Sequence, residues 1–156
     1  MFPELPRFGL RLFLPQEMSQ VNYYGMGPME CYRDKHHAAS HSSYTATVWQ
    51  LHEDYIRPQE NGSHFDCDYV MLSGDAVRLT AVGTQPFSFN ASHYTQEELT
   101  RKAHNYELEP CGSTVLCLDY AQNGIGSESC GPRLLEQYRL DDATFNFGLR
   151  LFPEKK

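Results

Sequence analysis

Positive charge is scarce in this chain. Its 156 residues include 13 Lys and Arg against 20 Asp and Glu, which gives a formal net charge of -7 at pH 7. Lys155-Lys156 forms only a short basic tail. Binding to nucleic acid or to an anionic membrane requires a cluster of cations that displaces phosphate counterions. We therefore expect neither nucleic acid nor a membrane among the partners of this chain.

The chain also lacks paired cysteines and long apolar runs. Its five cysteines, an odd number, lie at positions 31, 67, 111, 117 and 130, without the close spacing of a zinc ribbon or a redox motif. No segment approaches the roughly 20 apolar residues that span a bilayer. No stretch from Met1 combines a basic start, an apolar core and a cleavage site. These absences predict reduced thiols and a cytoplasmic location.

Aromatic residues, by contrast, are plentiful. The 10 Tyr and 9 Phe contribute to an aromatic share of 13%, which favours strands over helices. The one convincing helix start is Thr95, which can cap a short helix while Glu98 closes a capping box; this helix should end before Tyr106. A chain of this length fits one domain. Apolar alternation and turn signals predict strands at residues 7–14, 20–24, 45–52, 65–72, 77–84, 87–90 and 114–120.

Residues 32–43 are polar and rich in histidine. Because imidazoles spaced along a helix can converge on one ion, His36, His37 and His41 raise the hypothesis of a metal site. Their Ser and Ala neighbours provide no carboxylate ligand at a fixed offset. We therefore expect a solvated loop here, with no metal.

A glycine-rich stretch covers residues 122–132, Gln-Asn-Gly-Ile-Gly-Ser-Glu-Ser-Cys-Gly-Pro. It lies between the predicted strand that ends at Tyr120 and a short predicted strand at residues 138–140. Glycine and proline permit or fix backbone conformations that other residues resist. We expect a shaped loop whose frame is provided by Gly124, Gly126, Gly131 and Pro132. The side chains that this loop could aim at a ligand are those of Glu128, Ser129 and Cys130.

Two further motifs precede this loop: residues 25–34, Gly-Met-Gly-Pro-Met-Glu-Cys-Tyr-Arg-Asp, and residues 57–62, Arg-Pro-Gln-Glu-Asn-Gly. In this order, the three motifs resemble the C-terminal part of a β-galactosidase of glycoside hydrolase family two. The resemblance runs from Leu5 to Phe152 and falls within the family's last, mutarotase-like β-domain.

The resemblance implies an all-β fold, an antiparallel β-sandwich of the galactose mutarotase-like supersandwich type, with one short helix. Residues 1–156 would form a single domain, equivalent to the C-terminal half of the last, small-chain domain. The family's catalytic glutamates lie in an α/β barrel, and this sequence has no run of alternating strands and helices. We therefore expect no catalytic residue and no cofactor in this chain, and no activity from this segment alone.

The resemblance also implies roles for individual residues. Ser129 and Cys130, with Glu128, would shape the leaving-group side of the substrate cleft. The residues that match the family motifs would be structural: Glu30, Tyr32, Asp34, Arg57, Glu60, Asn61, Gly62, Gly124, Gly126, Gly131 and Pro132. A buried Glu60 paired with an arginine would tie segments together. Two positions depart from the family pattern: Cys31 replaces an asparagine, and His64 replaces an arginine.

A half sandwich would leave strand edges and an apolar face uncovered. We therefore expect the remainder of a β-galactosidase chain, a large subunit, or a second copy in a homo-oligomer as a partner, and the resemblance implies a galactoside substrate. The alternatives are a complementing subunit of a split β-galactosidase and a stand-alone carbohydrate-binding module. We expect Trp49 in a core or sheet-face position. In the alternative of a carbohydrate-binding module, Trp49 would instead be a platform on which a sugar stacks. A mutarotase would need acid and base groups such as His52, His64 and Glu60.

Overall fold

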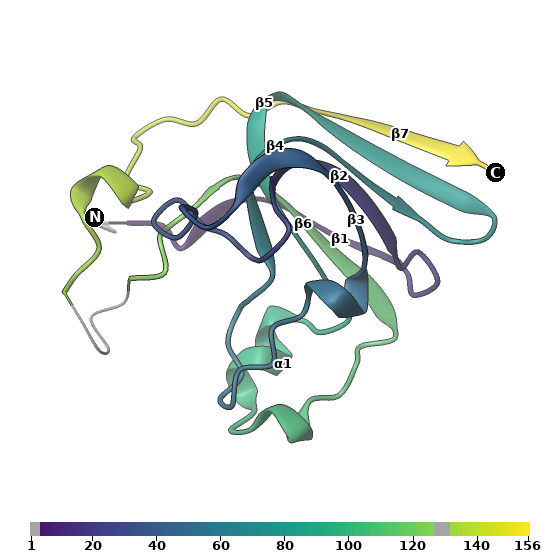
Figure 1. The fold of residues 1–156 in the computed structure, drawn as a ribbon, viewed down its shortest axis with the longest axis horizontal. Helices are drawn as coiled ribbons and strands as arrows, with labels where there is room; N and C mark the ends of the chain where they lie inside the picture. The colour runs from purple at the N-terminus through teal and green to yellow at the C-terminus, as the bar shows by residue number, and fades with distance from the viewer. Residues whose placement is uncertain (1–3, 127–131) are drawn as a thin grey trace.

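The computed structural model describes residues 4–126 and 132–156. Within these ranges the strands form one antiparallel sheet in the order β1-β6-β5-β4-β2-β3, and β7 also pairs with β5. Figure 1 shows that the sheet is strongly curled. The strands are β1 Arg7–Pro15, β2 Gln20–Gly27, β3 Ser40–Thr47, β4 Ser63–Ser73, β5 Val77–Ser92, β6 Ser113–Gln122 and β7 Leu149–Lys155.

Helical elements are few and short. The one α-helix, α1, covers Gln96–Arg101, and three 3-10 turns accompany it in the described ranges: η1 Val48–Leu51, η2 Asn105–Glu107 and η3 Glu136–Tyr138. No helix among the described residues is long and apolar enough to cross a membrane. The prediction of an antiparallel all-β fold with one short helix is confirmed.

One edge of the long strand β5 pairs with two other strands. Its residues 77–83 pair with β7, and its residues 88–92 pair with β6. Pro86, which has no N–H to donate, lies between the two ladders. The β4–β5 register also shifts around Cys67, as expected where a strand bends. The prediction of two separate strands, at residues 77–84 and 87–90, is wrong. Gly83 and Pro86 suggest a break there, but β5 continues through it as one strand with a bulge.

The core lies on the concave side of the curled sheet. Its largest members come from alternate positions of β2, β4, β5 and β6, which face inward because successive strand residues point to opposite faces. The fully buried aromatic and aliphatic side chains of this core include Tyr23, Val70, Leu72, Phe87, Phe89, Leu116 and Leu118.

Two further sequence expectations need correction. The strand predicted at residues 45–52 instead begins at Ser40, inside the predicted loop, and ends at Thr47, where η1 starts. Thr47 ends the strand because its hydroxyl accepts a hydrogen bond from Gln50 N at 3.2 Å and caps η1. Trp49 therefore lies in η1, not in the core or on a sheet face. Residues 138–140 form no strand, since Tyr138 closes η3.

The start of α1 was predicted correctly. The Thr95 hydroxyl caps the helix by accepting a hydrogen bond from Glu98 N at 3.1 Å. Glu98 does not complete the capping box. Its carboxylate instead binds Arg101 and accepts a hydrogen bond from Glu109 N at 3.1 Å. As expected, the helix ends before Tyr106.

Candidate functional site

The first and second sequence motifs meet at Glu30. Its buried carboxylate accepts a hydrogen bond from the backbone N–H of Gly62 at 2.9 Å and from Lys35 Nζ at 2.7 Å. Tyr32 donates to it at 3.3 Å, and Tyr55 also donates to it. Burial by itself would raise the pKa of Glu30, but these donors outweigh burial and the pKa lies below its usual value. Glu30 is therefore held as a carboxylate that joins two distant segments.

Gly62 sits at this joint for a conformational reason. Its φ angle is 70°, a left-handed conformation that a side chain disfavours. The preceding residue, Asn61, fixes the same turn, because its side chain accepts a hydrogen bond from Glu53 N at 3.0 Å and donates one to Gln59 O at 2.9 Å. The Asn-Gly pair thus aims the Gly62 N–H at the Glu30 carboxylate.

The first and third motifs meet at Asp34. Its two carboxylate oxygens accept the backbone N–H groups of Ile125 at 3.0 Å and Gly126 at 2.9 Å. Gly124 allows this approach, because a Cβ added there would lie 2.6 Å from Asp34 Cγ and would also collide with Leu134. The start of the glycine-rich stretch is thus held against the first motif.

An ion-pair network centred on Arg7 connects the second motif to the sheet. The Arg7 guanidinium pairs with both Glu60 and Asp119, and Nε donates to Asp119 Oδ1 at 3.1 Å. Gln122 Nε2 lies 3.2 Å from Asp119 Oδ2 and 3.2 Å from Asn90 Oδ1. The predicted tie between Glu60 and an arginine is present, and Arg7 is the partner.

This network contains two carboxylates for one guanidinium. Burial and the Asp119 charge raise the pKa of Glu60, and Arg7 opposes them only in part. Burial likewise raises the pKa of Asp119 despite hydrogen bonds from Arg7 and Gln122. Removal of Arg7 would therefore leave two poorly solvated negative charges facing each other.

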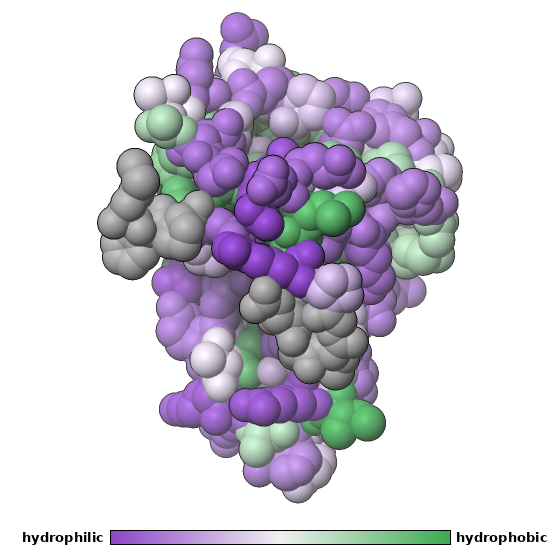
Figure 2. Space-filling model, turned by 90° about the vertical axis from the view of Figure 1, so that its left-hand side faces the viewer, coloured by the Kyte–Doolittle hydropathy of each residue, from purple (hydrophilic) through white to green (hydrophobic). Residues whose placement is uncertain are grey.

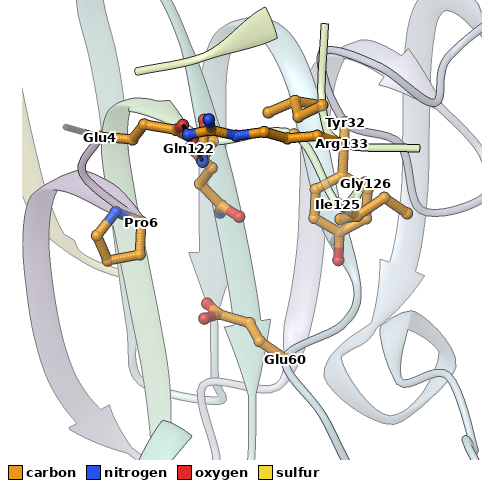
Figure 3. Close-up of a pocket in the computed structure, with 11 residues that line it drawn as sticks. Glu4, Pro6, Tyr32, Glu60, Gln122, Ile125, Gly126 and Arg133 are labelled. Carbon is orange, nitrogen blue, oxygen red and sulfur yellow. Dashed lines mark hydrogen bonds and ion pairs between the residues drawn. The ribbon is translucent and has the colours of Figure 1, made fainter. Parts of the chain in front are cut away.

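A pocket of about 570 Å³ lies where the motifs meet, which we call the Glu60 pocket. Figure 3 shows Glu60 on one side of it, and Arg133 reaching across to Glu4 on another. Figure 2 shows that the side of the molecule with the N-terminal segment and η3 is mainly hydrophilic. The polar residues that line the Glu60 pocket are Glu4, Tyr32, Glu60, Gln122, Asn123 and Arg133, a set that can donate and accept hydrogen bonds.

Four of the predicted site residues are not described by the structure, and two others are exposed. Glu128, Ser129, Cys130 and Gly131 fall outside the described residues, and Pro132, which follows them, is exposed. Arg57 is exposed and forms no ion pair within residues 4–126 and 132–156.

The two departures from the family pattern are both buried. Cys31 Sγ accepts a hydrogen bond from Phe65 N at 3.3 Å and lies 3.4 Å from Met26 O. His64 lies in the core, with Nδ1 3.2 Å from Met26 O, and burial lowers its pKa to about 4. A neutral His64 forms no ion pair, and its position away from the Glu60 pocket gives no support to an acid or base role.

Sequence reasoning missed Arg7, Asn90 and Asp119. All three lie within predicted strands, and the sequence pattern assigns them no role beyond the strand. Asn90 and Asp119 are buried, and a polar residue at an inward position needs a hydrogen-bonding partner. Asn90 and Asp119 lie 83 and 112 residues from Arg7 in the sequence, so no local sequence pattern identifies them as its partners.

Comparisons of the sequence with known proteins identify its family. The family model described as "Beta galactosidase small chain" matches residues 1–151. A Beta-galactosidase of Actinobacillus pleuropneumoniae is 50% identical over 153 residues, which cover 98% of this chain and 15% of that protein. A Beta-galactosidase of Staphylococcus xylosus is 45% identical over 149 residues, covering 96% of this chain and 15% of that protein.

A Beta-galactosidase of Kluyveromyces lactis is 32% identical over 146 residues, covering 93% of this chain and 14% of the relative. The chain thus spans about 15% of the length of these relatives. Because a family model covers nearly the whole of it, this chain belongs to the beta-galactosidase small chain family.

Proposed function

We propose that this chain works as the small-chain segment of a β-galactosidase that hydrolyses terminal β-galactosides of the lactose type. In this role it forms scaffold and part of the leaving-group side of the substrate cleft, through Ser129, Cys130 and Glu128. The catalytic glutamates lie on another segment, and this segment alone is inactive. Family membership supports the proposal, together with the geometry around the glycine-rich stretch.

The observation that carries the cleft role is the double hydrogen bond from Ile125 and Gly126 to Asp34. It anchors the chain just before Ser129 and Cys130, beside a polar pocket of about 570 Å³. A substrate contact requires positioned groups, and the anchored amides of Ile125 and Gly126 give the described part of the stretch a fixed position. Cys130 acts in this proposal by packing and hydrogen bonding, not as a nucleophile.

The expected lack of activity follows from the carboxylates of the Glu60 pocket. A glycosidase uses one carboxylic acid to protonate the leaving group and a second carboxylate as nucleophile or base. Glu60 and Glu4 line this pocket, where Glu60 binds Arg7 and Glu4 binds Arg133; Asp119, which lies outside the pocket lining, also binds Arg7. None of these carboxylates is free for either role, so we propose that the reacting pair comes from the rest of a β-galactosidase.

Association with that remainder is supported by apolar openings between β1 and β7. Cavities of about 350 and 480 Å³ lie there, lined by Phe8, Leu10 and Phe147 at one end and by Leu14 and Leu79 at the other. Apolar side chains that remain open beside a sheet can be buried by another chain segment. The chain provides only about 15% of the length of its relatives, so we propose the remainder of the β-galactosidase, or a large subunit, as the occupant.

A chimaera tests the cleft role. The matched segment of the Actinobacillus pleuropneumoniae enzyme, 50% identical to this chain, is replaced by this chain, and Cys130→Ala is compared with the unchanged chimaera. Hydrolysis of lactose and of a nitrophenyl galactoside is measured, because the two substrates differ only in the leaving group. We expect Cys130→Ala to alter the ratio of their kcat/KM values severalfold, with Cys111→Ala as the control. An unchanged ratio for Cys130→Ala would contradict the cleft role.

A further inference from the structure

A second surface of interest surrounds Trp49, which packs beside His93 and Tyr94, just before the start of α1. Trp49 is the only tryptophan of the chain, and 50% of it is exposed. Its backbone is held by a capping box at the start of η1, because Gln50 N donates to Thr47 Oγ1 at 3.2 Å and Thr47 N donates to Gln50 Oε1 at 2.8 Å. An exposed indole therefore stands on a rigid support.

Two further rings give this surface a defined shape. The Tyr94 ring stands nearly perpendicular to the indole of Trp49, with centroids 5.9 Å apart and an interplanar angle of 78°. His93, which is buried, packs on the indole at 4.6 Å, and its Nδ1 lies 3.3 Å from Ser113 O. Trp49 and Tyr94 thus form the floor and the wall of a step, and His93 anchors the step to the sheet.

Polar groups border the step. His52 packs against Tyr94 at 5.1 Å, and its Nε2 lies 4.0 Å from Asp54 Oδ1. The Asp54 side chain is 76% exposed and is oriented by Asn105, whose Nδ2 donates to Oδ1 at 2.9 Å. Burial, with a smaller contribution from Asp54, raises the pKa of Tyr94, so the phenol keeps its proton and can donate it in a hydrogen bond.

We propose that Trp49, Tyr94 and Asp54 form a binding platform for a pyranoside, a site separate from the Glu60 pocket. The apolar C–H face of the sugar ring packs on the indole of Trp49, as aromatic faces pack on apolar groups. Its hydroxyl groups donate to the Asp54 carboxylate and accept from the Tyr94 phenol. The step between floor and wall admits one ring lying flat and leaves its far side in water.

Charge favours a sugar over a protein segment as the occupant. Glu53 and Asp54, both exposed, border the aromatic step. A protein segment that covered the step would take these carboxylates out of water at a cost in solvation free energy, whereas a small sugar leaves them largely solvated and offers hydroxyl donors to them. One stacking face with few hydrogen bonds supplies little binding free energy, so half-saturation is expected in the millimolar range.

The single tryptophan makes the test direct, because the intrinsic fluorescence of the chain reports on Trp49. Methyl β-galactoside is titrated into the 156-residue chain with and without iodide as a quencher, and glycerol at equal concentration controls for cosolute effects. We expect a saturable change in emission and a lower iodide quenching constant with the galactoside only. Asp54→Asn should raise the half-saturation about fivefold, the loss of one hydrogen bond, and Asp75→Asn in the β4–β5 turn should leave it unchanged.

Saturation-transfer NMR observed on the sugar gives a second readout, since it does not need tryptophan emission. Transfer from the chain to methyl β-galactoside should disappear in Trp49→Ala, with circular dichroism confirming that the variant is folded. A linear response shared with glycerol, or transfer that persists in Trp49→Ala, would overturn the proposal. Shielding of Trp49 by the added remainder of a β-galactosidase, without any sugar effect, would overturn it in favour of a protein interface. These readouts do not depend on hydrolysis. A failure of the platform proposal can therefore be distinguished from a failure of the proposed role in the substrate cleft.

Discussion

The carboxylate of Asp34 accepts a hydrogen bond from the backbone N–H of Gly126, 92 residues later in the chain, with 2.9 Å between Oδ2 and N. Its second oxygen does the same for Ile125. One side chain of the first motif thereby sets the position at which the glycine-rich stretch leaves β6. The contact explains why an acidic residue and a glycine-rich stretch so far apart belong to one arrangement.

Asp34→Ala should loosen this stretch. The change removes two charge-assisted hydrogen bonds at the protein surface, and we expect a loss of about 1–2 kcal/mol in the free energy of unfolding. Hydrogen exchange at the amides of Ile125 and Gly126 should become faster, as measured by NMR. Asp68→Ala, in an exposed part of β4, is the matched control. Equal exchange rates in Asp34→Ala and the unchanged chain would refute the anchoring role.

Gly124 and Gly126 should respond differently to the same change. A Cβ at Gly124 would lie 2.6 Å from Asp34 Cγ, whereas a Cβ at Gly126 would meet its nearest neighbour, Leu134 Cδ1, at 3.4 Å. We expect Gly124→Ala to cost about 1–3 kcal/mol through overpacking and Gly126→Ala to cost less than about 1 kcal/mol. Urea denaturation of the two variants measures the difference. Similar losses in both would show that the close packing at Gly124 is not the cause.

Arg7→Ala should be among the most destabilising single changes in the chain. It leaves the buried Asp119 and the partly exposed Glu60 without their shared cation, and an uncompensated buried charge such as that of Asp119 costs about 3–5 kcal/mol. The exposed pair between Arg78 and Glu154 gives a matched control, because Arg78→Ala should cost less than about 1 kcal/mol. The midpoints of urea denaturation at pH 7 measure the loss of stability in the two variants. A loss for Arg7→Ala as small as that for Arg78→Ala would mean that the network is solvated.

The contribution of His64 to the stability of the fold should fall between pH 6.5 and pH 4. Burial lowers the pKa of His64 to about 4, whereas an unfolded histidine has a pKa of about 6.5. In this window the unfolded chain binds the extra proton, so the free energy of unfolding decreases as the pH falls, by about 2 kcal/mol at pH 5 for this one residue.

His64→Gln should reduce this pH dependence, as measured by urea denaturation at pH 7.5 and pH 5. It should not abolish it, because burial also lowers the pKa of His52, which titrates in the same direction. An undiminished loss of stability at pH 5 in His64→Gln would contradict a neutral, buried His64.

The alternation of apolar and polar residues predicted the strands that bury one face. It could not predict the contacts that join these strands and loops to one another. β2 follows the period-two rule, with every second residue buried from Val21 onward. Alternation also continues past Thr47, so the sequence pattern gave no sign that Thr47 would cap η1 and leave Trp49 half exposed. The ties from Arg7 to Asp119 and from Asp34 to Gly126 join residues far apart in the chain. No local pattern encodes such contacts, because each depends on the curl of the whole sheet.

The central claim is tested most directly by complementation. A related β-galactosidase lacking its matched segment is mixed with this chain, and the hydrolysis of a chromogenic galactoside is followed together with the light-scattering mass of the mixture. The account predicts that neither part hydrolyses the galactoside alone and that activity appears with a complex containing both. Activity of the shortened enzyme alone, or a mixture that neither associates nor hydrolyses, would contradict it.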